Sequence, residues 1–245
     1  MRILLINPNT TTSVTDLITQ YVRPMVGEND EIVPVTGRFG ARYISTRAAA
    51  AIAAHAGLDL LASHVQGCDA VYLACFGDPG LLALREVSPV PVIGMAEASC
   101  HAACARGDRF GIVTGGALWK PMLTEFVATL GLADRFAGVQ TIAPTGDLIA
   151  NDPDAALADL ARACEACRTQ GGADVVILGG AALAGLAARL QPGVSIPLLC
   201  SVETGMQAVI SAARQPRQGS QRERGPVKTI GLSAALETLL GATSN

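Results

Sequence analysis

One cysteine of this sequence stands where a side chain can do chemistry. Cys75 follows the apolar run Ala70–Leu73 and opens the turn 75–80 (CFGDPG), which leads into a helical stretch at Leu81–Val87. A thiol in such a turn faces backbone N–H groups and the positive end of a helix dipole, and both favour the thiolate. We therefore expect Cys75 to be a functional, ionisable thiol.

Two further turns carry polar groups that could hold a small ligand. The first follows the run Arg2–Ile6, and from it we expect Asn7 and Thr10 to hydrogen-bond a polar ligand. The same turn also allows the simpler interpretation that Asn9 or Thr10 caps the helix expected near Thr12. The second turn, Thr114-Gly115-Gly116, offers a hydroxyl and exposed amides, which can bind a carboxylate or a developing oxyanion.

The remaining cysteines have the pattern of core residues. The chain holds 7 cysteines, an odd number, which favours free thiols over a disulfide framework. Cys100 and Cys104 lie four positions apart, and Cys164 and Cys167 three apart, inside Ala-rich helical stretches. A zinc site would need a second such pair to converge on the first, together with suitable histidines. We therefore expect these four cysteines to be small buried hydrophobes rather than zinc ligands.

The sequence lacks the motifs of several classes of function. There is no phosphate-binding or dinucleotide-binding glycine motif and no Gly-x-Ser-x-Gly elbow. The 3 histidines, His55, His64 and His101, have no metal-ligand spacing. With 21 acidic against 18 basic residues, the chain has no basic field for a nucleic acid. We expect a small-molecule substrate, no metal or nucleotide cofactor, and no nucleic-acid or membrane partner.

Composition points to a protein of the cytoplasm. Of the 245 residues 50% are apolar and 16% charged, yet no run approaches the ~20 apolar residues of a spanning helix. The start, residues 1–8, is too short and too soon broken for a signal peptide. The small charged fraction also suggests that some surface is buried in a homo-oligomer.

The elements that must position these turns alternate along the chain. Short β-branched runs are followed by Gly/Pro/Asn turns and Ala/Leu-rich helical stretches, a pattern that indicates parallel sheets covered by helices. We expect strands at Arg2–Ile6, Glu31–Pro34, Ala70–Leu73, Pro91–Ile93, Phe110–Val113, Gly138–Ile142, Val175–Leu178 and Pro197–Leu199. The stretch 214–226, rich in Arg, Gln, Gly and Pro, is expected to be a solvated surface loop.

The alternation contains an internal repeat. Residues 2–7, 69–75 and 91–93 resemble residues 109–114, 174–180 and 197–199, at offsets of 107, 105 and 106 positions. Two pseudo-symmetric α/β domains are therefore expected: residues 1–97 with a C-terminal helical segment at about 205–245, and residues 98–204. Since ligands of open parallel sheets bind beyond the carboxyl ends of the strands, we expect the site in a cleft between the domains.

Four motifs together resemble a known family: 6–10 (INPNT), 74–80 (ACFGDPG), 91–98 (PVIGMAEA) and 109–114 (RFGIVT). In this order they are similar to the aspartate/glutamate racemase superfamily, in its hydantoin/allantoin racemase branch. The resemblance runs from Met1 to about Ala213. It implies two pseudo-symmetric Rossmann-like α/β domains, an interdomain active site, a multimer, and racemisation without pyridoxal phosphate or metal.

The resemblance also implies a pair of cysteines, one from each domain, on opposite faces of the substrate. One thiolate removes the proton α to a carbonyl, and the other thiol returns a proton to the opposite face. Cys75 matches the first. At the place of the second this chain has Gly180, so the opposite-face acid is missing; a water in that space or Cys200 could substitute. Ligand contacts are expected from Phe76, Gly77 and Ala181, besides the two polar turns.

Three functions remain open at this point. The first is a racemase-like enzyme in which Cys75 is the acid/base. The second is another cofactor-free enzyme with a single thiol, such as an arylmalonate-type decarboxylase or an isomerase. The third is a binding protein that has kept the cleft and lost catalysis. Rapid alkylation of Cys75, with protection by ligand, would separate the enzymes from the binding protein.

Overall fold

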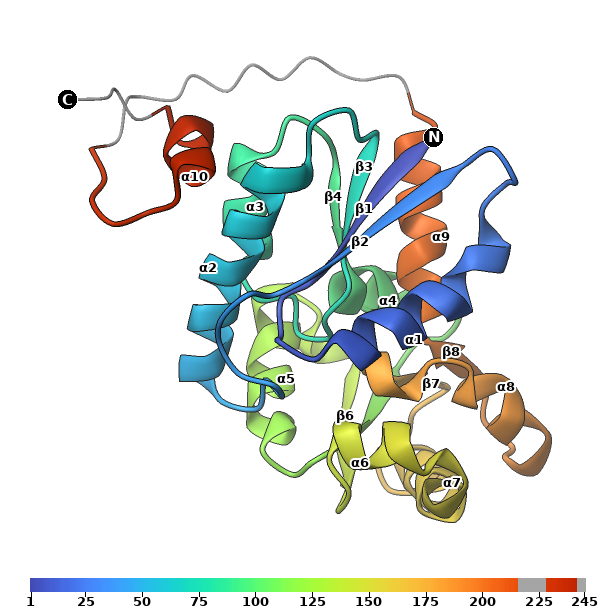
Figure 1. The fold of residues 1–245 in the computed structure, drawn as a ribbon. Coiled ribbons are helices and arrows are strands. Elements are labelled where there is room, and N and C mark those ends of the chain that lie inside the picture. The colour runs from blue at the N-terminus through green and yellow to red at the C-terminus, as the bar shows by residue number, and fades with distance from the viewer. Residues whose placement is uncertain (216–227, 242–245) are drawn as a thin grey trace.

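The computed structural model describes residues 1–215 and 228–241 and contains two four-stranded parallel sheets (Figure 1). The first sheet has the order β2-β1-β3-β4 and the second the order β6-β5-β7-β8. The strands are β1 (Arg2–Asn7), β2 (Glu31–Thr36), β3 (Ala70–Leu73), β4 (Val92–Gly94), β5 (Phe110–Gly115), β6 (Phe136–Ile142), β7 (Val175–Leu178) and β8 (Leu198–Cys200). The α/β class and all eight expected strands are thereby confirmed.

Small shifts at the strand ends have a chemical reason. β4 and β8 begin one residue later than expected, after Pro91 and Pro197, because proline has no N–H for the ladder. Both proline carbonyls still accept a hydrogen bond, from Val71 N at 2.8 Å and Val176 N at 2.9 Å. Pro34 lies within β2, an edge strand, which is where a sheet tolerates proline.

Helices connect and cover the strands. They are α1 (Thr12–Val22), α2 (Arg47–His64), α3 (Leu81–Val87), α4 (Met95–Cys104), α5 (Trp119–Thr129), α6 (Gly146–Asn151), α7 (Pro153–Thr169), α8 (Leu186–Leu190), α9 (Ser201–Ala213) and α10 (Ala234–Leu239). Short 3-10 turns lie at Arg23–Met25, Ala133–Arg135, Ala181–Leu183 and Gln191–Gly193. The central strands β3 and β7 are fully buried, as their continuous apolar sequences predict for sheets covered on both faces.

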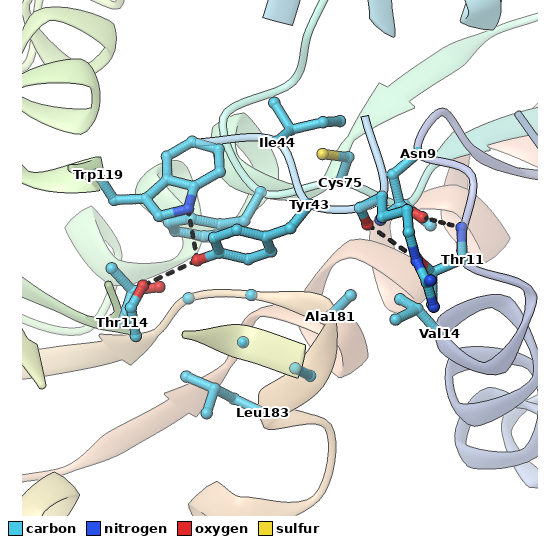
Figure 2. Close-up of a pocket in the computed structure, with 18 residues that line it drawn as sticks. Asn9, Thr11, Val14, Tyr43, Ile44, Cys75, Thr114, Trp119, Ala181 and Leu183 are labelled. Atoms are coloured by element: carbon cyan, nitrogen blue, oxygen red, sulfur yellow. Dashed lines mark hydrogen bonds between the residues drawn. The ribbon is translucent and has the colours of Figure 1, made fainter. Parts of the chain in front are cut away.

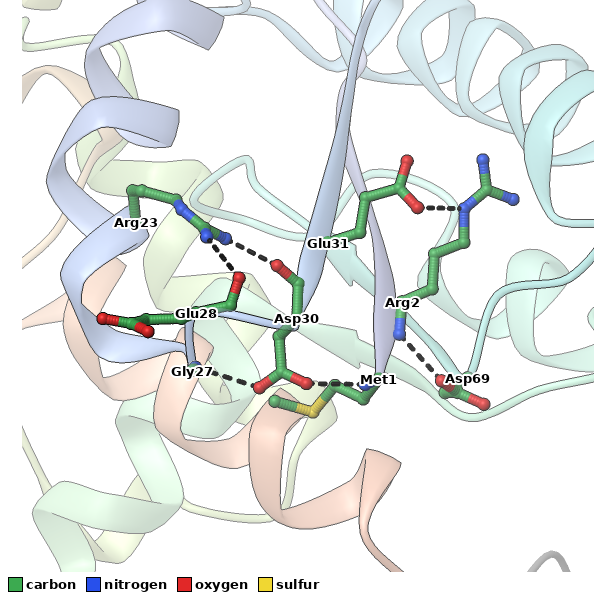
Figure 3. Close-up of polar contacts among 8 residues, drawn as sticks. All are labelled: Met1, Arg2, Arg23, Gly27, Glu28, Asp30, Glu31 and Asp69. Carbon is green, nitrogen blue, oxygen red and sulfur yellow. Dashed lines mark hydrogen bonds and ion pairs between the residues drawn. The ribbon is translucent and has the colours of Figure 1, made fainter.

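The internal repeat is visible in matched hydrogen bonds. Arg2 N donates to the Asp69 carboxylate at 2.7 Å, and Arg109 N donates to the Asp174 carboxylate at 2.9 Å. In both halves an aspartate just before one strand thus fixes the start of the neighbouring strand, at the first residue of β1 and at the residue just before β5. Around Arg2 the first half adds ion pairs, among them that of the Met1 ammonium with Asp30 at 2.6 Å (Figure 3).

Two helices tie the halves together. α4, which follows β4 of the first sheet, packs on β7 of the second, whereas α9 follows β8 and packs on β3. The two helices also pack on each other (Figure 1). Both sheets therefore share one apolar core, in which Cys100, Cys164 and Cys167 are buried as expected. Cys104 is only partly buried, and none of the seven cysteines, all of which the structure describes, is in a disulfide.

The domain boundaries expected from the sequence stay a prediction, although the division into two sheets agrees with them. The expected loop at 214–226 lies, beyond Gln215, outside the described residues. Among the helices that the structure describes, none is both long and apolar enough to cross a membrane.

Candidate active site

The carboxyl ends of the two sheets meet around one cavity. Its empty volume is about 670 Å³, part of it open to solvent. Lining residues come from both halves: Asn9, Thr11, Val14, Arg42, Tyr43, Ile44, Ala74, Cys75 and Phe76 from the first, and Thr114, Gly115, Trp119, Gly146, Gly179, Gly180, Ala181, Ala182 and Leu183 from the second. The cavity expected between the domains from the repeat is therefore present (Figure 2).

Cys75 lies in the wall of this cavity and is only 8% exposed. Ala74 N, directly after β3, donates to the Ile6 carbonyl and continues the ladder with β1 to the edge of the turn. The Cys75 carbonyl then accepts a hydrogen bond from Asp78 N at 3.1 Å. The thiol is thus held at the end of the central strand by backbone bonds on both sides.

Burial raises the pKa of the Cys75 thiol to about 12, and the negative charge of Asp78 adds to this effect. The expectation of a stabilised thiolate is thereby corrected. The loss of hydration in the apolar wall outweighs any favourable dipole from the short helix α3. In the unliganded protein the resting form of Cys75 is the neutral thiol.

Asp78 is the carboxylate whose charge acts on the Cys75 thiol, and sequence reasoning missed it. Its side chain accepts hydrogen bonds from Ala96 N at 2.9 Å and Glu97 N at 2.7 Å, at the start of α4. A Cβ on Gly94 would come within 2.3 Å of its Oδ2, so this approach requires glycine there. Asp78 is also a non-glycine residue with positive φ, at 47°. The turn is therefore held by an aspartate with a strained backbone, whose two carboxylate oxygens both accept hydrogen bonds.

Phe76 carries the Cys75 turn across to the second half. Its ring lies against Gly179, where an added Cβ would approach Cε1 of the ring to 2.3 Å. A Cβ added to Gly77 would similarly approach Cζ3 of the Trp119 ring to 2.9 Å. Close packing thus accounts for glycine at both positions. Gly77 was expected to contact the ligand, but it does not line the cavity.

Gly180 lies at the end of β7, in the place that matches Cys75 at the end of β3. Its φ of 135° and ψ of 142° are seldom adopted by residues with a side chain. Its N–H donates to Ser201 Oγ at 3.1 Å. The space beside it is open: the nearest atom to an added Cβ is Thr114 Oγ1, at 3.7 Å.

Not all expected ligand contacts face the cavity. Asn7 is fully buried, and its amide donates to Asn9, Thr11 and Thr15 within the turn after β1. Asn7 and Thr10 therefore lie outside the lining, which instead takes Asn9 and Thr11 from the same turn. The N-cap of α1 is Thr11, with no side-chain capping bond, so the simpler interpretation that Asn9 or Thr10 caps this helix is wrong. Asn9 Oδ1 instead accepts from Thr11 N at 2.9 Å within the turn.

The second half shows one similar difference. Thr114, Gly115 and Ala181 line the cavity as expected, whereas Gly116 does not. Gly116 N is turned to the Ile142 carbonyl at 3.0 Å. Cys200 is also outside the lining; it lies near Tyr21 of α1. This position corrects the expectation that Cys200 could replace a missing thiol.

A segment without any sequence signal forms one side of the cavity. Residues 37–46, which we name the strap, connect β2 to α2 and bring Tyr43 to the second half. The Tyr43 hydroxyl donates to the Gly115 carbonyl at 3.0 Å and accepts from Trp119 Nε1 at 2.9 Å. In the view of Figure 2 the ring lies below Cys75 and above Ala181 and Leu183. The strap therefore joins the two halves across the site.

Among the lining residues, all of which the structure describes, the charged side chain is Arg42, and Cys75 is the one thiol, with no carboxyl, imidazole or amine beside it. No three His, Cys, Asp or Glu side chains gather as metal ligands within the described parts of the chain. The site thus offers one acid/base thiol, the cation of Arg42, several neutral hydrogen-bonding groups and apolar lining residues.

Comparison with known proteins agrees with this geometry. Residues 3–209 match the model of the Asp/Glu/hydantoin racemase family. The chain belongs to this family. A hydantoin racemase of Pseudomonas sp. (strain NS671) is 31% identical over 84% of this chain and 84% of the relative. The resemblance to the racemase family in the four sequence motifs is confirmed.

Solved structures of other proteins have the same architecture. The crystal structure of allantoin racemase from Pseudomonas fluorescens has a TM-score of 0.85 and 28% identity, and the match covers 94% of this chain and 100% of that one. A liganded double mutant of arylmalonate decarboxylase has a TM-score of 0.66 at 15% identity, covering 92% and 95% of the two chains. At that identity the decarboxylase shares the fold alone.

Proposed function

We propose that the protein catalyses proton transfer at a carbon α to a carbonyl, without a cofactor, and that Cys75 is the acid/base. The substrate is of the hydantoin, allantoin or amino-acid type, in keeping with the hydantoin and allantoin racemases that the chain resembles. The observation that carries the proposal is the placement of Cys75 as the only thiol in the wall of the interdomain cavity.

In the reaction the C–H bond at the α carbon breaks, its proton forms the S–H bond of Cys75, and the electron pair spreads onto the carbonyl oxygen. A carbon acid is weak, so its base must be strong. The raised pKa of Cys75 makes the thiolate scarcer but makes each thiolate a stronger base. Return of a proton to the same face of the α carbon completes hydrogen exchange with solvent. Delivery of a proton to the other face inverts the configuration of that carbon.

The cavity has groups for the rest of the substrate. Asn9 Nδ2 has no hydrogen-bond partner among the described residues and can donate to a ring or carbonyl oxygen. Val14, Ile44 and Leu183 are apolar lining residues on different sides of the cavity and can contact a hydrocarbon substituent (Figure 2). Polar orientation together with an apolar wall is the usual composition of a small-molecule site.

The experiment is proton NMR in D₂O of a single-enantiomer 5-substituted hydantoin, followed by the same measurement with allantoin. We expect wild type to replace the α proton by deuterium and Cys75→Ala to fall to the rate without enzyme. Cys104→Ala is the matched control, because Cys104 lies on α4 outside the cavity lining. Exchange by Cys75→Ala at the wild-type rate would contradict the proposal.

Gly180 favours one second candidate, a decarboxylase with a single thiol. If the substrate is a malonate, its C–C bond breaks, CO₂ leaves, and the resulting enediolate takes one proton from Cys75. With no side chain at Gly180, protonation from one face would give one product enantiomer. Release of CO₂ from an arylmalonate, without α-proton exchange in hydantoins, would favour this candidate over the racemase.

A further inference from the structure

The pseudo-symmetry of the fold defines which half must serve the second face of a substrate. Cys75 follows β3 and Gly180 follows β7, and these strands have the same place in the two sheets. Both residues line the one cavity between the sheets. A substrate whose α carbon faces Cys75 therefore turns its other face to the second half, around Gly180.

One hydroxyl of the second half is available at that place. Thr114, near the end of β5, is 6% exposed and lines the cavity. Its Oγ1 is the nearest atom to the position of a Cβ on Gly180, at 3.7 Å. Within the parts of the chain that the structure describes, this hydroxyl makes no hydrogen bond. Every fully buried side-chain N or O atom there has a hydrogen-bond partner, so the Thr114 oxygen is not fully buried. The Thr114 hydroxyl is thus an unpartnered polar group that is open to the cavity.

The other polar groups near this wall are already engaged. The Tyr43 hydroxyl donates its proton to the Gly115 carbonyl. Ser201 Oγ accepts from Gly180 N and donates to Met95 Sδ at 3.6 Å, and Ser201 is fully buried outside the lining. Asn9 and Thr11 belong to the first half, with Cys75. Thr114 is the group of the second wall whose proton is free to move.

We propose that the Thr114 hydroxyl delivers a proton from solvent to the face of the substrate opposite Cys75, in place of a side chain at position 180. This inference rests on the proposed function and names the second acid of the same site. It explains how a chain with glycine at the end of β7 can invert a stereocentre.

The step balances with water as the co-reactant. Cys75 takes the α proton, and the carbanion takes the hydroxyl proton of Thr114 on its other face. A water molecule gives a proton to Thr114 Oγ1 as that proton leaves, since a hydroxyl can donate and accept at once. The hydroxide that remains takes the proton from Cys75, so that Cys75 is again a thiolate and Thr114 a hydroxyl, as at the start of the step. The open side of the cavity admits the water.

The test measures two rates in D₂O on one enantiomer of a 5-substituted hydantoin. Deuterium in the unreacted enantiomer reports proton removal and return on the Cys75 face, once the thiol has exchanged with solvent. Formation of the other enantiomer, followed by chiral chromatography, reports delivery to the opposite face. The ratio of the two rates separates a face-specific acid from a group that helps both steps.

Thr114→Val is the decisive variant, because valine keeps the shape and removes the hydroxyl. We expect inversion to fall at least tenfold while deuteration with retention continues. Thr114→Ser should keep both rates within a few-fold, which guards against a folding defect in the valine variant. Thr11→Val removes a hydroxyl from the first wall and should leave the ratio of the rates unchanged.

Each other outcome contradicts a defined statement. Equal loss of both rates in Thr114→Val, with Thr114→Ser intact, would make Thr114 a stabiliser of the carbanion and overturn the inference alone. Unchanged inversion in Thr114→Val would overturn it too. Absence of any Cys75-dependent deuteration in wild type would contradict the proposed function and the inference together.

Discussion

Asp78 opposes the ionisation of Cys75 from within the same turn. Its carboxylate is bonded to the first amides of α4, and its charge adds to burial in raising the pKa of the Cys75 thiol. Arg85 of α3 and Glu97 of α4 also act on this carboxylate, and Tyr72 and Cys100 lie within its field. The residue that fixes the turn therefore also adds to the basicity of the thiolate, beside the larger effect of burial.

Asp78→Asn should lower the pKa of Cys75 and move its reaction with iodoacetamide to lower pH. Asparagine tolerates a positive φ and keeps one of the two oxygens that accept from the α4 amides, while the charge is lost. A shift of about one pH unit is the size expected from a nearby like charge. The measurement is the alkylation rate of Cys75 against pH, by mass spectrometry.

Glu86→Gln is the matched control for this shift, since it removes a carboxylate elsewhere on α3. It should leave the alkylation profile of Cys75 where wild type has it. A profile for Asp78→Asn that coincides with wild type would show that the charge of Asp78 does not reach the thiol.

The stability of the protein should depend on pH through Asp78. Burial raises its pKa to about 7, although the bonds from Ala96 and Glu97 oppose this. An aspartate of an unfolded chain titrates near pH 4, so the folded state binds the extra proton between about pH 4 and 7. The free energy of unfolding therefore falls as pH rises through this window and levels off above it.

Urea unfolding at pH 5 and pH 8 tests this dependence. Between these pH values we expect the free energy of unfolding of wild type to fall by at least about 1.4 kcal/mol more than that of Asp78→Asn, the equivalent of one pKa unit. Comparing the two proteins cancels groups with the opposite trend, such as Glu165, whose pKa is lowered to about 2 by Arg168. Parallel pH profiles would place the titration elsewhere.

Gly179→Ala should destabilise the protein by about 1–3 kcal/mol, because its Cβ would enter the Phe76 ring. Gly193→Ala is the control: no atom lies within 4 Å of an added Cβ there. Thermal unfolding measures both. Equal melting temperatures for the two variants would mean that the Phe76 ring can move aside, and the Cys75 turn would then be less fixed than the packing indicates.

Tyr43→Phe should loosen the strap and change the environment of Trp119, the only tryptophan of the chain. Loss of the acceptor leaves the indole N–H without its partner, at a cost of about 1–3 kcal/mol. We expect a shift of the tryptophan emission maximum and a KM raised several-fold, with a smaller change in kcat. Tyr21→Phe, near Cys200 and away from Trp119, should leave the emission unchanged.

Patterns along the chain predicted what depends on local sequence and on the repeat. Apolar runs located the strands, and the offset of 105 positions between Cys75 and Gly180 indicated that the two residues lie at matching strand ends. Long-range contacts left no such signal. Tyr43 reaches the site only because the strap crosses to the second half, and Asn9 rather than Asn7 faces the cavity because of how one turn satisfies its own hydrogen bonds.

Gly180→Cys should raise the rate of inversion relative to deuteration with retention, because it places an acidic thiol beside the second face. The open space around an added Cβ admits the side chain, while the φ of 135° opposes it. Such strain costs about 1–3 kcal/mol. Gly180→Ala carries the same strain without the thiol and should lower stability with no gain in inversion. In the Thr114→Val background the new thiol should restore inversion, and failure of a folded double variant to do so would show that position 180 does not face the α carbon.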